Sequence, residues 1–469
     1  MSRDGEATGR RPALDRAAWP MREADRAPSI SDRLDRLPVT RLHLAMTALC
    51  TLGLFADIAE VALSNALAAI FIAPPYGIPR GDLALFLASV FIGGAVGAPL
   101  FGLLGDRFGR RRALQASLTV MALGSLAAAA SPDLTTLTIA RCITGFAIGG
   151  YPPLAASYLS DVLPPARRGT MMFISTGLGF LGAPAVILLI RGLTPVLPPG
   201  VEAWRIALAA GGVIAVLAAL LFARLPESPR WLASFGRGRQ ADSVARRFER
   251  AAGVPSPPAA ALGPDPAEPT RTGWRALAAD RRSARRTALF FALFALGPFA
   301  TIGFPLLSAA VLIQKGFKVD QSLLFAALSM VGPSLGTVAA ALVVDRFGRR
   351  TCLVATASTM IAMGTLFAES VDFTALMLAG IAFNTAAAIY AGILTLYCTE
   401  LLPTPLRASA LTIAWAAGRI AASLVPILLL PLLTDHGARA MFAAITAALS
   451  ASILLTLTGP RGLTGKPVA

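Results

Sequence analysis

The hexapeptide Asp106-Arg107-Phe108-Gly109-Arg110-Arg111 occurs a second time in this chain as Asp345-Arg346-Phe347-Gly348-Arg349-Arg350. The copies start at residues 106 and 345, which are 239 residues apart. A second pattern, Tyr158…Asp161…Pro164…Arg168, returns at the same offset as Tyr397…Glu400…Pro403…Arg407. Gly93 and Gly97 map with this offset onto Gly332 and Gly336, and such small-residue spacing lets membrane helices approach closely. The shared offset indicates that the chain contains two copies of one ancestral unit.

Long apolar blocks surround the repeated segments. Of the 469 residues, 55% are hydrophobic and only 14% are charged, whereas a soluble chain has about a quarter of its residues charged. Most blocks have the length that roughly 30 Å of hydrocarbon requires of a helix. We count about twelve: 42–72, 83–104, 113–131, 134–159, 170–190, 203–223, 287–313, 322–344, 352–370, 373–398, 408–433 and 439–457. The sequence therefore predicts an all-α integral membrane protein, with twelve transmembrane helices in two six-helix pseudo-repeats.

The net charge of +16 is distributed in a way that reports topology. Arginine clusters follow alternate blocks, at 107–112, 167–168, 224–286, 346–350 and 407, whereas the intervening loops carry few basic residues. By the positive-inside rule, this pattern puts both termini and every even-numbered loop in the cytoplasm of a multi-pass inner (plasma) membrane protein. Membrane topology therefore explains the excess of basic residues, and we expect the lipid bilayer as a partner and no nucleic acid.

The same pattern divides the chain into five parts. We expect a disordered cytoplasmic tail at 1–41 without a cleavable signal peptide, a six-helix bundle at 42–223, a cytoplasmic linker with short helices at 224–286, a second bundle at 287–457 and a tail at 458–469. Four cysteines and two histidines show no metal-ligand spacing, so we expect neither a metal nor a cofactor. We expect a monomer.

These motifs resemble the major facilitator superfamily over nearly all of residues 42–457. Gly102-x-x-x-Asp106-Arg107-x-Gly109-x-Arg111 is similar to the superfamily's loop signature, although the second copy has Ala341 in place of the leading glycine. Pro226-Glu227-Ser228-Pro229-Arg230-Trp231-Leu232 resembles the branch of sugar porters and metabolite symporters. The resemblance implies alternating access, with a cytoplasmic ion-pair latch. The latch candidates are Asp106, Arg107, Gly109, Arg111, Asp161, Arg168, Glu227, Arg230, Asp345, Arg346, Arg350, Glu400 and Arg407. The alternative for any single arginine is that it only fixes topology.

Four ionisable residues fall inside apolar blocks: Asp57, Glu60, Arg141 and Arg419. A charge at the bilayer centre costs about 2.5–3.5 kcal/mol or more, so each should face a cavity or a partner. Asp57 and Glu60 share a helix face. Their spacing resembles the D-x-x-D pair of aromatic-acid symporters, with Glu60 as a departure, and Arg141 matches an arginine of the sugar-porter branch. We predict that Asp57, Glu60 and Arg141 couple transport to protons. The alternative is a purely structural ion pair.

The substrate site is less clearly marked. Arg419 could pair with a first-half carboxylate or bind a substrate carboxylate, for which its fork of donors is suited. Trp415, Tyr151, Asn384 and Tyr390 are candidate cavity residues, and packing is the alternative for each. The seventh block lacks the Gln-Gln and Asn constellation of sugar-binding relatives and offers Pro298, Thr301, Pro305 and Ser308 instead. This composition favours an organic acid, especially an aromatic one, over a hexose.

The sequence thus predicts a proton-coupled symporter for a small organic solute. Within transporters, the alternatives are a sugar porter and a drug/proton antiporter. A non-transporting membrane solute sensor is the alternative from another class. A membrane enzyme is disfavoured because no nucleophile–base pair or metal spacing is visible.

Overall fold

The structure is a computed structural model that describes residues 29–198, 200–256, 281–343, 348–401 and 404–459. The first half of the bundle consists of α2 (Arg41–Ile72), α3 (Arg80–Phe108), α4 (Arg110–Ala129), α5 (Leu134–Val162), α6 (Pro165–Gly179), α7 (Gly182–Leu193) and α8 (Ala203–Phe222). The second half consists of α12 (Arg281–Thr301), α13 (Gly303–Gln314), α14 (Val319–Ser329), α15 (Val331–Val343), α16 (Arg349–Glu369), α17 (Phe373–Leu401) and α18 (Thr404–Thr458). Three short helices, α1 (Ile30–Asp35), α9 (Pro229–Ser234) and α10 (Gly238–Ala252), complete the described chain.

Each half makes six crossings of the bundle. The pairs α6/α7, α12/α13 and α14/α15 each form one interrupted crossing. The long α18 contains two crossings, because Gly437 has a φ of 80° and ends one helical path before the next begins. Among the described residues, 9 helices are long and apolar enough to span a membrane when α18 counts as one. Those 9 do not include α4 and α5, which carry the arginines at 110–112 and Arg141. The predicted all-α membrane architecture is confirmed.

Glycines set the closest helix contacts, and they do so in the same way in both halves. A Cβ added to Gly97 of α3 would lie 1.8 Å from the carbonyl oxygen of Phe146 on α5, and Gly93 is equally tight. The corresponding Gly336 of α15 would bring a Cβ to 2.6 Å from the carbonyl oxygen of Thr385 on α17. Only glycine permits this backbone approach, so the glycines that share the 239-residue offset make equivalent packing contacts.

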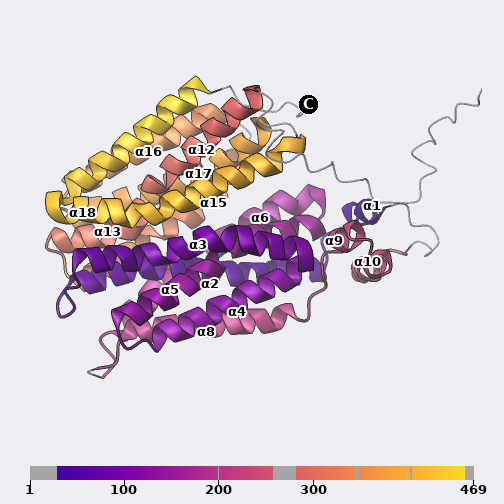
Figure 1. The fold of residues 1–469 in the computed structure, drawn as a ribbon, viewed down its shortest axis with the longest axis horizontal. Helices are drawn as coiled ribbons and strands as arrows, with labels where there is room; N and C mark the ends of the chain where they lie inside the picture. The colour runs from indigo at the N-terminus through magenta and orange to yellow at the C-terminus, as the bar shows by residue number, and fades with distance from the viewer. Residues whose placement is uncertain (1–28, 199, 257–280, 344–347, 402–403, 460–469) are drawn as a thin grey trace, which may run out of the picture.

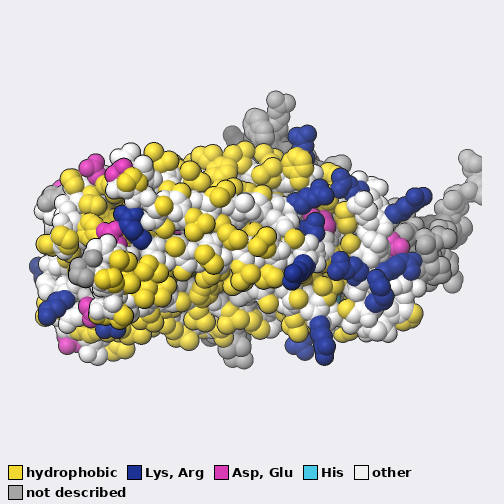
Figure 2. Space-filling model, turned by 90° about the horizontal axis from the view of Figure 1, so that it is seen from below, with side chains coloured by type: hydrophobic (Ala, Val, Ile, Leu, Met, Phe, Trp, Pro, Cys, Tyr) yellow, Lys and Arg dark blue, Asp and Glu magenta, His cyan; other side chains and the backbone are white. Residues whose placement is uncertain are grey.

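The two ends of the molecule differ in charge. The helices α1, α9 and α10 lie together at one end (Figure 1). Lys and Arg side chains gather toward this end on the face shown in Figure 2, and apolar side chains cover the middle. We call this the basic end and the other the opposite end. An apolar band of this kind is what a lipid-facing surface requires.

The apolar core shows where the halves meet. One cluster of buried side chains joins α2 from Ala59 to Phe71 with α13 from Phe304 to Leu312, so it crosses between the halves. A second cluster contains the basic-end part of the first half, with α1, α9 and α10 packed against it. Among the described residues, that second cluster includes none from the second half. Continuous apolar packing between the halves therefore lies toward the opposite end.

Candidate functional site

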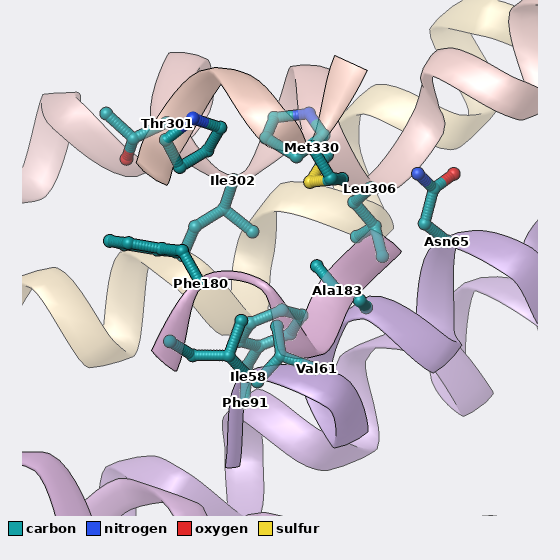
Figure 3. A pocket seen from close by; sticks show the side chains of 13 residues that line it. Ile58, Val61, Asn65, Phe91, Phe180, Ala183, Thr301, Ile302, Leu306 and Met330 are labelled. Atoms are coloured by element: carbon teal, nitrogen blue, oxygen red, sulfur yellow. The ribbon is translucent and has the colours of Figure 1, made fainter. Parts of the chain in front are cut away.

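A cavity of about 150 Å³ lies between the two halves, where three crossings are interrupted (Figure 3). Phe180 follows the last residue of α6, Thr301 ends α12, Ile302 separates α12 from α13, and Met330 separates α14 from α15. All four residues line the cavity. The full lining is Ile58, Val61, Ala62, Asn65, Phe91, Phe180, Ala183, Thr301, Ile302, Pro305, Leu306, Met330 and Pro333. Broken helices between two repeats are the usual setting of a transporter's solute site.

Prolines help to interrupt these helices. A proline removes the hydrogen bond to the carbonyl four residues earlier, which for Pro333 is that of Ser329. The amide Nδ2 of Asn384 on α17 donates to this Ser329 carbonyl oxygen at 3.2 Å. Pro305 stands in the same relation to Thr301. The structure thus gives Asn384 an interhelical hydrogen bond within the second half.

Glu60 and Arg141 form a fully buried ion pair within the first half. Nη1 of Arg141 on α5 donates to Oε2 of Glu60 at 2.5 Å, and Nη2 donates to the Glu60 carbonyl oxygen at 2.7 Å and to Oγ of Ser64 at 2.9 Å. The hydroxyl of Ser125 on α4 donates to the other carboxylate oxygen. A Cβ at Gly211 of α8 would lie 2.6 Å from this carboxylate, so glycine leaves it room. Four helices therefore enclose one ionised pair.

Asp57 lies one helical turn before Glu60 and has a different partner. It is 3% exposed, and its Oδ1 has no hydrogen-bond partner among the described residues. Its charge interacts with that of Arg419, which comes from α18 in the other half. Arg419 also lies over the ring of Trp415, 5.8 Å from the centroid. Glu60 thus has its ion-pair partner in its own half, whereas Asp57 makes no ion pair among the described residues and feels the charge of Arg419 from the other half.

The remaining predicted substrate residues, apart from the exposed Trp415, pack inside the helix bundle. The hydroxyl of Tyr151 on α5 donates to the carbonyl oxygen of Cys50 on α2 at 3.2 Å. Tyr390 is 1% exposed within the second half, and Trp415 is 37% exposed beside Phe294. These three, Asn384 and the four central charged residues do not line the cavity. Their roles in binding and coupling stay predictions.

At the basic end, Glu227 holds the N-terminus of α4. Its Oε1 accepts hydrogen bonds from the backbone amides of Arg111 at 2.9 Å and Ser228 at 3.0 Å. A carboxylate there offsets the positive end of the helix dipole. Gly109, with a φ of 106°, allows the approach, because a Cβ would lie 2.4 Å from Glu227 Oε2. Nη1 of Arg111 donates to the carbonyl oxygens of Ala223 and Leu225, at 3.2 and 2.9 Å.

Other latch candidates extend this network. Asp106 accepts from Arg110 at 2.6 Å, and Asp161 accepts from the Ser228 hydroxyl at 2.7 Å. Arg230 donates to the Asp161 carbonyl oxygen at 2.9 Å and pairs with Asp35, the last residue of α1, at 2.5 Å. The Asp106–Arg110 contact joins α3 to α4, and the others join Asp161 of the first half to Ser228 before α9 and Arg230 of α9 to Asp161 and α1.

The remaining latch candidates make separate contacts or lie outside the described residues. Arg168 lies 3.7 Å from Asp35, Arg107 stacks over Phe108, and Arg350 donates to the carbonyl oxygen of Leu457. Asp345 and Arg346 lie outside the described residues, as do the side chains of Glu400 and Arg407.

One ion pair between the halves was not predicted from the sequence. Nη2 of Arg191, near the end of α7, donates to Oδ2 of Asp320 at the start of α14 at 3.1 Å. Nε lies 2.8 Å from Oδ1, within ion-pair distance. The pair links the two halves at the opposite end.

The sequence reasoning also missed most of the cavity. The missed signal was the position of glycines and prolines inside apolar blocks: Gly179 and Gly182 beside Phe180, and Pro333 after Met330. Interrupted apolar segments in both halves point to a transporter's binding site.

Comparison with known proteins identifies similar molecules. The family model described as "Sugar (and other) transporter" matches residues 59–460. The Bacillus subtilis protein YyaJ is 28% identical over 435 residues, covering 92% of this chain and 95% of that protein. The niacin transporter NiaP of Acinetobacter baylyi is 27% identical over 410 residues, covering 86% and 90%.

Solved structures show the same fold. The xylose transporter XylE from E. coli, in a partially occluded inward open conformation, superposes with a TM-score of 0.71 at 20% identity. The match covers 91% of this chain and 99% of that chain.

Proposed function

The chain belongs to the sugar (and other) transporter family of the major facilitator superfamily, and from this membership we propose that it carries out proton-coupled symport of a small organic acid, preferably an aromatic one. The protein is a multi-pass membrane transporter, and its relatives are transporters rather than enzymes. The observation that carries the proposal is the arrangement at α2: two buried carboxylates beside a cavity between the halves.

The two carboxylates would divide the work of coupling. Glu60 meets Arg141 inside its own half, whereas Asp57 faces Arg419 across the interface. When the halves separate, Asp57 would lose that cation, and a buried carboxylate without a cation favours its protonated form. Proton binding would thus depend on which way the cavity opens. A solved relative described as a proton:xylose symporter supports this coupling ion.

The cavity argues for the substrate class. Its lining is almost entirely aliphatic and aromatic, with Asn65 and Thr301 as its two polar side chains among the described residues. A sugar carries several hydroxyls, and each would need a partner when it leaves water. A planar ring with one polar group fits this lining better, in agreement with the niacin transporter among the relatives. Arg419 would then guide the carboxylate on its way to the cavity.

Alternating access would use the two ends in turn. The apolar packing and the Arg191–Asp320 pair hold the opposite end closed. We propose that the basic end with both termini is cytoplasmic, that its ion pairs act as the latch, and that the protein works as a monomer in the inner membrane. The described conformation would be the one closed toward the outside.

Uptake into proteoliposomes tests the proposal. Labelled benzoate, nicotinate and D-xylose would be offered with and without an imposed pH gradient, acidic outside. We expect accumulation of an aromatic acid that depends on the gradient and collapses when a protonophore removes it. Accumulation of xylose in preference to both acids would instead support a sugar porter. Uptake that ignores the gradient would refute proton coupling.

A further inference from the structure

Asn65 is an unpartnered amide at the edge of an otherwise apolar cavity. It lies on α2, 2% exposed, and neither Nδ2 nor Oδ1 has a hydrogen-bond partner among the described residues. Figure 3 shows it among the lining side chains, with Thr301 on the other side of the view. A buried amide that makes no hydrogen bond destabilises the empty protein, because it has lost its contacts with water and gained none in exchange. Asn384 differs, because its Nδ2 donates to the Ser329 carbonyl oxygen although its Oδ1 has no partner among the described residues.

The cavity limits what can meet this amide. Its volume of about 150 Å³ is that of a dry cavity able to hold one benzene ring. Thr301 already donates its hydroxyl proton to the Gly297 carbonyl oxygen at 3.1 Å, so it retains accepting capacity only. Among the described residues, Asn65 therefore supplies an uncommitted hydrogen-bond donor in the cavity wall; the amide is buried there, and a turn of the side chain would bring it to a ligand.

The charge of the ligand group follows from the same lining. No Asp, Glu, Lys or Arg is among the residues described as lining the cavity. An anion there would lose its hydration without gaining a cation, which is strongly unfavourable. The group that reaches Asn65 should therefore be neutral.

An amide side chain offers N–H donors and a carbonyl acceptor in one plane. Its complement is a planar group with a donor and an acceptor side by side, as in the two-point pairing of asparagine with adenine. A carboxamide has this pattern, and so does a protonated carboxylic acid. We infer that Asn65 is the specificity-determining residue of the cavity, and that it binds a neutral carboxamide or protonated carboxyl group attached to a single ring. The inference rests on the proposed function, because it names the form in which that function's substrate is held.

The test measures binding to the full-length protein in lipid nanodiscs by titration calorimetry, without any proton gradient. Benzamide, benzoate and toluene serve as probes. Asn65→Leu removes the amide, and Gln115→Leu on α4 is the matched control that removes an amide outside the cavity. In Asn65→Leu we expect benzamide affinity to fall by about tenfold to a hundredfold while toluene affinity holds, as for the loss of one or two hydrogen bonds. Gln115→Leu should change neither. Equal benzamide binding by Asn65→Leu and the parent protein would overturn the inference.

Benzoate tests whether the cavity binds a protonated carboxylic acid as well as a carboxamide. If the protonated acid binds, its apparent affinity falls about tenfold per pH unit above the acid's own pKa while that of benzamide stays constant. Benzoate that binds at neutral pH as tightly as at acidic pH would reveal a bound anion and contradict the inference. Should Asn65→Leu fail to fold, Asn65→Ser loses the two-point contact and gives the same comparison.

The failures of the two proposals are separable. Gradient-driven uptake with unchanged benzamide binding in Asn65→Leu would refute the role of Asn65 alone. Loss of benzamide binding in the variant, with no gradient-driven uptake by the parent protein, would refute proton coupling alone.

Discussion

Glu60→Gln should destabilise the protein strongly, because it leaves the charge of Arg141 uncompensated inside the first half. The Arg141 side chain has 0% exposure, and Glu60 supplies its anionic partner at 2.5 Å. After the change, the guanidinium would keep its contacts to the Glu60 carbonyl oxygen and to Ser64 but face no carboxylate in this pair. Removing one partner of a buried ion pair costs about 3–5 kcal/mol.

The matching double variant should be far less damaged. Glu60→Gln combined with Arg141→Met replaces both charges by neutral groups of similar size, which is often close to neutral for stability. We expect the double variant to recover at least about half of the loss caused by Glu60→Gln alone, a coupling typical of residues in contact. Glu202→Gln is the control, since it makes the same chemical change in a partly exposed pair with Arg205, which is worth about 0.2–1 kcal/mol.

Thermal unfolding in detergent, followed with a thiol-reactive dye, provides the assay. Cys50 and Cys352 are buried free cysteines, so they react when the bundle opens. The melting temperature of Glu60→Gln should fall by about 3–5 °C and that of Glu202→Gln by about 1 °C at most. A Glu60→Gln protein as stable as the parent, or a double variant less stable than both single variants, would refute the reasoning.

Three further outcomes are expected. Arg191→Gln breaks the contact with Asp320 on α14 and should raise the population of molecules open at the opposite end by up to about fivefold, because this partly exposed pair is worth about 1 kcal/mol at most. Distances between spin labels on α7 and α14 measure that population. Gly97→Ala should separate α3 from α5 and lower the melting temperature, whereas Gly102→Ala, where a Cβ meets nothing within 4 Å, should not. Burial raises the pKa of Glu249, but hydrogen bonds from Arg33 and Ser256, together with the charges of Arg33 and Arg246, outweigh it and set that pKa below its ordinary value. The contact of α1 with α10 should therefore be fully present above the ordinary carboxyl pKa and weaken as the pH falls through the lowered pKa of Glu249. Hydrogen exchange of the α1 backbone amides measures this contact. Protection of α1 that persists unchanged in acid, or in Arg33→Met at neutral pH, would contradict the prediction.

The repeat made the architecture predictable. Because Gly97 and Gly336 share the offset of the charged hexapeptides, the sequence indicated both the duplication and the close packing that the structure has. The length of the apolar blocks gave the crossings, although it could not reveal that α6/α7 or α14/α15 are interrupted. Helix breaks depend on a few glycines and prolines, which hardly alter the mean hydropathy of a block.

The site was only partly predictable, for a geometric reason. Spacing put Asp57 and Glu60 on one face of a helix, but the helix rotation decides which acid meets Arg141. The cavity face of α2, with Ile58, Val61 and Asn65, is adjacent to that charged face. A single amide such as Asn65 on that face forms no recognisable sequence pattern, so it was not predicted. Arg191 and Asp320 stand at helix ends in different halves, and their meeting depends on how the halves dock.

Proton-driven accumulation by Glu60→Gln and Asp57→Asn, compared with the parent protein in the same proteoliposomes, tests the coupling claim most directly. Each variant would be assayed for uptake of a labelled aromatic acid under a pH gradient, and for exchange of that acid across the membrane without one. We predict that gradient-driven accumulation is lost in Asp57→Asn, which removes the carboxylate that faces the other half, while exchange is retained. If both variants accumulated the substrate as the parent does, the carboxylates of α2 would not be the coupling site.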